Sequence, residues 1–283
     1  MIIDEAAQAT EGETVIPFLL KPKRVIAVGD PMQLPATLIS QEAVQYGFHR
    51  SLHERLMFGI GYDYGLLDVQ YRMKPCISKF PSHHFYQSRV KDGHNVLAKS
   101  YRGNFSVLRG IPFCFINVSG FEKQNEVTFS FYNEKEANVI VKLLKMVQRN
   151  CNDEDMWYSS EKIRIITFYQ GQVNCIRQLL RKNGLPNILV STVDSSQGCE
   201  AEIIILSFTR ANNQGIRGFV VDPNRLNVSL TRAKYQLICV GDGTRTLAET
   251  SRSKSNEKKC PLVELIRSAQ ERNVLHSEKI LSF

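Results

Sequence analysis

The sequence predicts an α/β fold in which parallel strands alternate with helices. Short apolar runs rich in β-branched residues recur along the chain, and segments with a helical spacing of apolar residues lie between them. Runs of this length and composition are typical of strands buried on both faces, as the strands of a parallel sheet are. The alternation of the two patterns indicates a doubly wound sheet covered by helices.

Each predicted element has its own sequence signal. Asn133 can cap a helix whose third position is Glu136, which is a variant of the capping box. A second helix is expected to stop at Gly184. The apolar stripes of these helices are Ala137, Ile140, Val141, Leu144 and Val147 in the first, and Val173, Ile176, Leu179 and Leu180 in the second. The predicted strands are residues 1–3, 24–28, 66–69, 112–118, 163–168, 188–193, 203–208 and 236–240.

The chain length of 283 residues suggests about two domains at ~150 residues per domain. We expect one unit over residues 1–108 and a second over 110–248, followed at 249–283 by a polar loop and a closing helix that covers 261–272. The first strand has no strand before it, and an open sheet without its first strands leaves an exposed edge. Residues 1–108 are therefore expected to be the C-terminal portion of a domain.

Composition excludes several classes of protein. The chain is 43% hydrophobic and 23% charged, which is unlike disordered, collagenous or coiled-coil chains. No apolar run reaches the ~18 residues of a membrane span, and the N-terminus lacks a secretory signal. The net charge of +8 fits a polyanionic partner and equally fits a slightly basic surface. The seven cysteines are scattered without a Cys-x-x-Cys pair, which favours reduced thiols of a nuclear or cytosolic protein over a zinc site.

Polar side chains follow three of the predicted strands. Asp4 and Glu5 come after the first, and carboxylates at the carboxyl end of a parallel strand can hold Mg²⁺ or activate water. Gln33 follows the second, and its amide can contact a phosphate and a water together. Tyr71 and Arg72 follow the third and suit a base and a γ-phosphate, respectively. Taken singly, the acidic pair could be surface carboxylates, Gln33 and Arg72 could be solvated side chains, and Tyr71 could be a tyrosine at the edge of the core.

Two further segments carry polar groups in the second unit. Residues 191–200 join two buried strands and are expected to place hydroxyls, a carboxylate and an amide at one edge of the sheet. Residues 224–234 are predicted to form a helix on which Arg225 and Arg232, seven positions apart, share a basic face. The alternative interpretation of that helix is a solvated charged surface.

The order of these segments is more specific than any one of them. DEAAQAT (4–10), GDPMQLPAT (29–37), QYRM (70–73), STVDSSQGCE (191–200) and NVSLTRAK (227–234) closely resemble successive motifs of superfamily-1 nucleic-acid helicases. The segments between these motifs, such as FPSHHFY (80–86), resemble those of the up-frameshift and senataxin branch of this superfamily. The resemblance extends from residue 2 to about residue 241 and implies two RecA-like domains with parallel sheets, the first of them truncated.

The resemblance implies an ATP- and Mg²⁺-dependent motor that moves along single-stranded RNA or DNA. Asp4 would hold Mg²⁺, Glu5 would activate water and Gln33 would sense the γ-phosphate. Arg72 and Arg232 would contact that phosphate from the two sides of a cleft between the domains. Such an arrangement makes hydrolysis depend on closure of the cleft.

The remaining roles concern the nucleoside and the strand. Tyr71 would stack near the adenine, Glu200 would reach the ribose, and Gln197 and Gly198 would lie beside the nucleotide. Two threonines would lie near the nucleic-acid backbone, namely Thr37 and Thr192. The resemblance also implies a nuclear location, with the cytoplasm as the alternative, and no membrane partner.

One motif of the family is missing from these residues. The chain contains no G-x-x-x-x-G-K-[ST] loop, which cradles the β- and γ-phosphates in the family and precedes DEAA. The first hypothesis is therefore a partial motor that needs the N-terminal portion of the same helicase and has little ATPase activity alone. The alternatives are a catalytically silent nucleic-acid-binding or scaffold module, and a Mg²⁺-dependent phosphohydrolase that uses Asp4 and Glu5.

Overall fold

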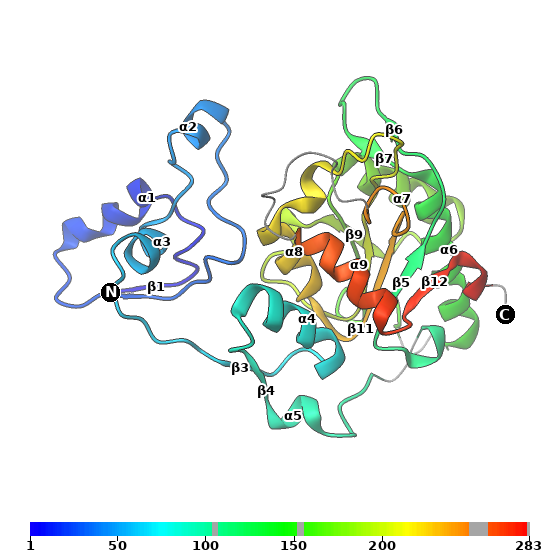
Figure 1. Cartoon of the computed structure of the whole chain (residues 1–283), viewed down its shortest axis with the longest axis horizontal. Coiled ribbons are helices and arrows are strands. Elements are labelled where there is room, and N and C mark those ends of the chain that lie inside the picture. The colour runs from blue at the N-terminus through cyan, green and yellow to red at the C-terminus, as the bar shows by residue number, and fades with distance from the viewer. Residues whose placement is uncertain (104–106, 152–155, 249–259, 282–283) are drawn as a thin grey trace. The chain divides into compact units, whose positions relative to one another are not determined.

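The chain forms two compact units in the computed structural model, which describes residues 1–103, 107–151, 156–248 and 260–281 (Figure 1). The units are Met1–Leu67 and Asp68–Phe283. The domain limits expected near residues 108 and 248 stay predictions, and the polar loop expected at 249–259 lies outside the described residues. None of the described helices has both the length and the apolar character needed to cross a membrane.

The Met1–Leu67 unit contains a two-stranded parallel sheet. Strand β1 (Ile2–Ile3) pairs with β2 (Ile26–Ala27), with Ile2 opposite Ile26. The side chains of these two isoleucines are 73% and 58% exposed, although strands of parallel sheets are normally buried. Short helical segments complete the unit: α1 (Glu11–Val15), η1 (Ile16–Leu20), α2 (Gln41–Gln45), α3 (Leu52–Glu54) and η2 (Arg55–Gly59).

The larger unit is built on a six-stranded sheet, which confirms the predicted α/β class with parallel strands. Every neighbouring pair of its strands is parallel, and the spatial order is β12-β5-β11-β10-β8-β9. All carboxyl ends therefore lie at one edge of the sheet. The strands are β5 (Phe113–Asn117), β8 (Ile163–Thr167), β9 (Leu189–Thr192), β10 (Ala201–Ser207), β11 (Ala233–Gly241) and β12 (Leu275–Ser277).

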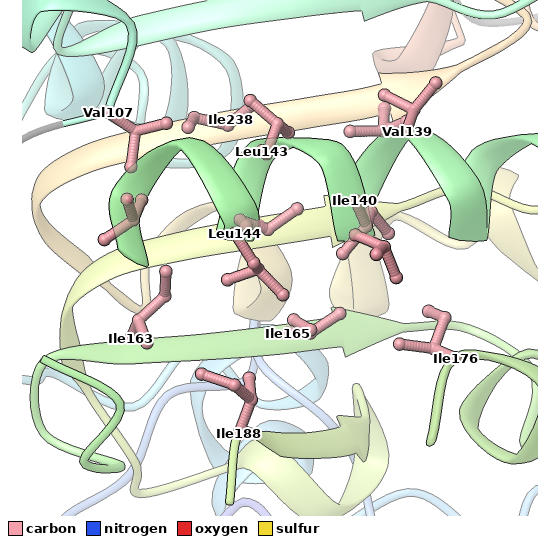
Figure 2. Close-up of a cluster of buried hydrophobic side chains, with 14 of the residues drawn as sticks. Val107, Val139, Ile140, Leu143, Leu144, Ile163, Ile165, Ile176, Ile188 and Ile238 are labelled. Carbon is pink, nitrogen blue, oxygen red and sulfur yellow. The ribbon is translucent and has the colours of Figure 1, made fainter. Parts of the chain in front are cut away.

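Helices cover both faces of this sheet. Helices α6 (Glu134–Asn150) and α7 (Gln170–Lys182) pack on one face, where Ile140 and Leu144 of α6 lie over Ile163 and Ile165 of β8 (Figure 2). These side chains are fully buried, and the two predicted stripes lie in the core except for Leu179, which is partly buried and packs against it. The opposite face carries α4 (Pro75–Tyr86), α8 (Pro223–Leu230) and α9 (Pro261–Glu271).

Small elements connect these layers. The pairs are β3 (Val69–Gln70) with β4 (Lys91–Asp92), which are parallel, and β6 (Lys123–Gln124) with β7 (Phe131–Tyr132), which are antiparallel. The other short segments are α5 (His94–Leu97), η3 (Leu108–Gly110), η5 (Asp194–Ser196), η6 (Gly218–Val221) and η7 (Glu278–Leu281).

The start of α6 confirms one half of the predicted capping box and corrects the other. Asn133 Oδ1 accepts hydrogen bonds from the backbone N–H groups of Lys135 and Glu136, as predicted. The Glu136 carboxyl does not return to the backbone N–H of Asn133. It is fully buried instead, and it accepts from Ser207 Oγ at 2.6 Å and from the backbone N–H of Thr209 at 2.8 Å. Packing against the end of β10 therefore takes this carboxyl away from the backbone N–H of Asn133, although its Oε1 still accepts from Asn133 Nδ2 at 3.4 Å.

The cysteines carry free thiols, as the sequence suggested. Cys114 and Cys239 are buried in the sheet. Burial raises the pKa of Cys114 to about 12, so this thiol stays protonated at neutral pH and packs as a small apolar group.

Candidate nucleotide and nucleic-acid site

The acidic pair follows β1 directly. Asp4 and Glu5 are both exposed, and Asp4 Oδ1 accepts a hydrogen bond from the backbone N–H of Glu5 at 2.9 Å. Glu5 lies in the left-handed region with φ of 50°, and the N–H of Ala6 then donates to the carbonyl oxygen of Val28. The turn therefore presents both carboxylates at the carboxyl end of the small sheet.

A glycine brings the second predicted segment to the same end of that sheet. A Cβ atom at Gly29 would lie 2.7 Å from the backbone nitrogen of Ala7, so only glycine allows this approach. Asp30 then holds the loop, because its Oδ2 accepts from Gln33 Nε2 at 3.0 Å. Gln33 thus lies on the loop that adjoins the acidic turn. Thr37, further along, is exposed.

The residues at this end fit a magnesium ion bound to a nucleotide. Mg²⁺ takes oxygen ligands and is usually bound through one or two carboxylates together with phosphates and waters. Asp4 and Glu5 supply two exposed carboxylates. Over the described ranges, no group of three or more His, Cys, Asp or Glu side chains is arranged to hold a metal ion.

Tyr71 directly follows β3 and is 56% exposed. Asn95 Nδ2 donates to the Tyr71 carbonyl oxygen at 2.8 Å, and the ring of His94 meets the Tyr71 ring edge-on. A Cβ atom at residue 93 would lie 2.4 Å from the Tyr71 ring. Gly93 therefore sets the position of the ring. The sequence analysis missed this residue, because only the pairing of β3 with β4 places it beside Tyr71.

A methyl group at residue 93 is expected to displace the Tyr71 ring. In Gly93→Ala the ring must move outward, because Cβ would overlap it, and we expect a stability loss of about 1 kcal/mol, the low end for overpacking. Tyrosine ring resonances in NMR spectra and urea unfolding measure the two effects. Gly65→Ala is the control, since a Cβ there meets no atom within 4 Å. Unchanged Tyr71 resonances in Gly93→Ala would contradict this role.

Arg72 belongs to a charged cluster at the amino end of the large sheet. Its Nε donates to Glu200 Oε2 at 2.7 Å, and its Nη1 donates to the carbonyl oxygen of Thr231 at 3.0 Å. Lys234 Nζ lies 2.6 Å from the other oxygen of Glu200. Hydrogen bonds from Lys234 and Arg72 hold the pKa of Glu200 below its usual range, so the carboxylate is ionised between two cations.

Arg232 adjoins this cluster and is 3% exposed. Its Nε donates to the Val228 carbonyl oxygen and its Nη2 to Thr231 Oγ1, both at 3.0 Å. Arg72 and Arg232 are therefore joined through Thr231. The structure thus brings Tyr71, Arg72, Glu200 and Arg232, which are predicted nucleotide contacts, to one region of the larger unit.

The predicted helix over residues 224–234 is wrong at its end. Helix α8 stops at Leu230, and β11 begins at Ala233, paired with β10 and β5. Arg232 therefore lies beyond the helix and shares no face with Arg225, which is in the first turn of α8. Pairing in the sheet overrides the helical pattern, since strand residues 233–241 gain two neighbouring strands.

The segment over residues 191–200 does not lie at one edge of the sheet. Thr192 ends β9 at the carboxyl edge, and Glu200 precedes β10 at the amino edge, because both strands run parallel to β8. Thr192 Oγ1 is 2.9 Å from Ser195 Oγ. Near the other end, Gly198 has φ of 74°, and the buried Nε2 of Gln197 has no acceptor in the described part of the chain. That donor fits a nucleotide oxygen.

Comparisons with known proteins find matches over most of the chain. Two family profiles, each described as an AAA domain, match residues 1–41 and 48–244. Together these matches include all the motif segments quoted above.

Named relatives are also similar over most of the chain. The chain is 37% identical over 259 residues to the ATP-dependent helicase NAM7 of Saccharomyces cerevisiae, covering 89% of this chain and 26% of that protein. It is 39% identical over 256 residues to helicase SEN1 of the same yeast, covering 88% of this chain and 11% of SEN1. For the ATP-dependent helicase upf1 of Schizosaccharomyces pombe the identity is 38% over 251 residues, covering 86% of this chain and 26% of that protein. The chain thus spans about a quarter or less of each of these relatives.

Proposed function

The chain belongs to the up-frameshift/senataxin-like branch of the superfamily-1 helicases, and from this membership we propose that it is part of an ATP-driven motor acting on single-stranded RNA or DNA. The observation that supports the proposal best is the cluster of Arg72, Glu200 and Arg232, which the exposed Tyr71 directly precedes in the chain. These side chains come from three separated motifs and meet at one region, as a nucleotide site requires.

Our proposal gives each predicted residue one task. In the Met1–Leu67 unit, Asp4 binds the magnesium ion, Glu5 orients and deprotonates the attacking water, and Gln33 contacts the terminal phosphate. The bound ion neutralises charge that develops on the transferred phosphoryl group. Arg72 and Arg232 both lie in the larger unit, although the resemblance implied opposite sides of a cleft, and we propose that they stabilise charge on the γ-phosphate.

The nucleoside contacts come from the larger unit. Tyr71 stacks on the adenine, and Glu200, Gln197 and Gly198 bind the ribose side of the nucleotide. In the structure Glu200 holds the Arg72 guanidinium. On this proposal Arg72 turns from Glu200 to the phosphate, because a guanidinium forms charge-assisted hydrogen bonds with either anion.

The phosphate cradle is the part that these residues do not supply. The 283 residues contain no G-x-x-x-x-G-K-[ST] loop. We propose that another portion of the same helicase donates that loop and the strands that flank β1 and β2. The exposure of Ile2 and Ile26 supports this, because further strands and helices would bury them.

Nucleic acid is proposed to bind mainly through its phosphates. Thr192 at the carboxyl edge of the large sheet and Thr37 in the smaller unit are the proposed backbone contacts. Binding that rests on phosphate contacts falls with rising salt and shows little sequence preference. We propose a nuclear location from the senataxin-like resemblance, with the cytoplasm as the alternative that imaging of the tagged full-length protein would reveal.

Strand binding and ATP hydrolysis test the proposal together. The 283-residue chain is expected to bind a single-stranded oligonucleotide with an affinity that decreases from 50 to 200 mM salt. The longer protein that carries the phosphate loop is expected to hydrolyse ATP when nucleic acid is added. Glu5→Gln in that protein is expected to lower turnover ~10²-fold while nucleotide binding is kept.

Glu42→Gln is the matched control, since Glu42 is an exposed carboxylate of the same unit. Salt-sensitive strand binding without hydrolysis by the longer protein would favour the binding or scaffold module. Metal-dependent hydrolysis that Arg232→Ala leaves unchanged would favour the phosphohydrolase. Either result contradicts the motor.

A further inference from the structure

An exposed phenylalanine lies at the carboxyl edge of the large sheet, and contacts with neighbouring residues, which we call its frame, fix its position. Phe219 lies in η6, and its side chain is 55% exposed. It belongs to none of the motifs that predicted the site. Single exposed apolar rings are common on protein surfaces, so the information about the use of Phe219 comes from the contacts that fix it.

The backbone of Phe219 is fixed by Tyr169, which follows β8. The N–H of Phe219 donates to the Tyr169 hydroxyl oxygen at 3.1 Å, and Arg210 Nη1 donates to the same oxygen at 3.2 Å. Gly218 makes this approach possible, because it has φ of 60°. A Cβ atom at residue 218 would lie 2.5 Å from the Tyr169 hydroxyl oxygen and 2.5 Å from Arg210 Nη1. The Phe219 and Tyr169 rings are 5.6 Å apart with 30° between their planes.

A buried ion pair makes this frame rigid. Arg210 binds Glu122 through two hydrogen bonds of 3.0 and 2.8 Å, and the side chains of the pair are only 5% and 10% exposed. The Arg210 guanidinium also lies 4.2 Å from the centre of the Phe131 ring. The loop between β10 and α8 is thus tied to the residue before β6 and to β7.

A second arginine links Phe219 to the predicted strand-binding edge. The Arg225 guanidinium lies over the Phe219 ring, 5.0 Å from its centre. Arg225 Nε also donates to Asp194 Oδ1 at 3.0 Å. Asp194 is two residues beyond Thr192, the proposed backbone contact. A strand that passes Thr192 would therefore meet an aromatic ring and a guanidinium at the neighbouring position.

We propose that Phe219, together with the Arg225 guanidinium that lies over its ring, is a stacking site for one base of the bound single strand. The proposal rests on the proposed nucleic-acid function and adds a specific subsite to it. Stacking on an aromatic ring tolerates every base, because each base has a π face. A ring whose position is already fixed loses little conformational freedom when the base binds.

Affinity for a fluorescently labelled oligo(dT) or oligo(U) 15-mer tests the subsite with the 283-residue chain. Phe219→Ala is expected to weaken binding about tenfold, the loss of one base stack. Phe219→Tyr is expected to keep the affinity, and Phe219→Leu is expected to behave like alanine because it has no π face. The salt dependence is expected to stay unchanged in all three, since no phosphate contact is removed.

Two controls separate stacking from a change of structure. Phe58→Ala removes a ring that is also 55% exposed, in the other unit, and is expected to leave affinity unchanged. An oligonucleotide of the same length with abasic sites offers no base to stack, so wild type and Phe219→Ala are expected to bind it equally. Urea unfolding of each variant verifies that the fold is kept.

The outcomes separate this subsite from the function on which it rests. If the unaltered chain binds the strand and Phe219→Ala binds it equally well, the subsite is wrong and the proposed function stands. If Phe219→Ala weakens binding to the abasic strand as much as to the normal one, the ring does not stack on a base. If the unaltered chain binds no single strand, both proposals are overturned.

Discussion

Arg210→Ala is expected to lower the free energy of unfolding of the larger unit by ~3–5 kcal/mol. Both side chains of the Arg210–Glu122 pair are almost fully buried, and Glu122 also accepts from the backbone N–H of Ala211 and from Asn212 Nδ2. Removal of the guanidinium leaves a buried carboxylate without its cation. That uncompensated charge, and not the loss of one contact, makes the effect large. Urea unfolding monitored by circular dichroism measures it.

A matched pair on the surface serves as the control for this prediction. Lys91 and Asp68 are 72% and 43% exposed, so Lys91→Ala is expected to change stability by less than about 1 kcal/mol. The double variant Arg210→Ala with Glu122→Gln is expected to recover part of the loss, because it removes the unpaired charge as well. A loss below about 1 kcal/mol in Arg210→Ala would mean that the pair does not hold the loop.

The larger unit is also expected to lose stability as the pH rises from about 5 to about 8. Burial raises the pKa of Glu136 to about 8 from an ordinary value of 4.5, and the nearby Asp242 and Glu122 act in the same direction, while hydrogen bonds from Ser207 and Thr209 oppose them. Between these two pKa values the folded state keeps a proton that the unfolded state has released. Each pH unit in that window therefore costs about 1.4 kcal/mol, or roughly 4 kcal/mol in all.

Glu136→Gln is expected to remove most of that dependence, because a glutamine does not ionise. The expected result is a nearly flat profile from pH 5 to 8 and a variant more stable than the wild type at pH 8. Urea unfolding at half-unit intervals of pH gives the profile. Glu134→Gln on the same helix is the control, since Glu134 is about half exposed and pairs with Lys123 at the surface. A flat profile in the wild type would show that Glu136 ionises as freely as in the unfolded chain.

The strands of the large sheet were predictable because their surroundings are uniform. Residues 163–168 and 203–208 are predicted to be buried strands, and the observed strands β8 and β10 cover almost the same residue ranges. Both lie inside the sheet with helices on each face, so every position favours an apolar, β-branched side chain. The stripe that begins at Ala137 was predictable for the same reason, since one face of α6 meets only the core.

Three sequence patterns led to wrong predictions of local structure. In each case, contacts with residues distant in the chain replaced the predicted local arrangement. The Glu136 carboxyl accepts from Ser207 and Thr209 and not from the backbone N–H of Asn133. The helical pattern at residues 224–234 is cut short when β11 pairs with its neighbours. Residues 191–200 connect opposite edges of the sheet, because β9 and β10 both run parallel to β8 and the chain must return to its starting edge.

In the candidate site, too, the sequence identified some features and the tertiary structure decided others. Motif order alone identified the family and nominated Asp4, Glu5, Arg72 and Arg232, because the chemistry of phosphoryl transfer restricts which side chains can serve. Folding added Gly93 under Tyr71, Glu200 between Arg72 and Lys234, and the frame around Phe219. These arrangements join residues from different strands and loops. The sequence carries the identity of such residues, whereas their distances depend on how the sheet pairs and how the helices pack on it.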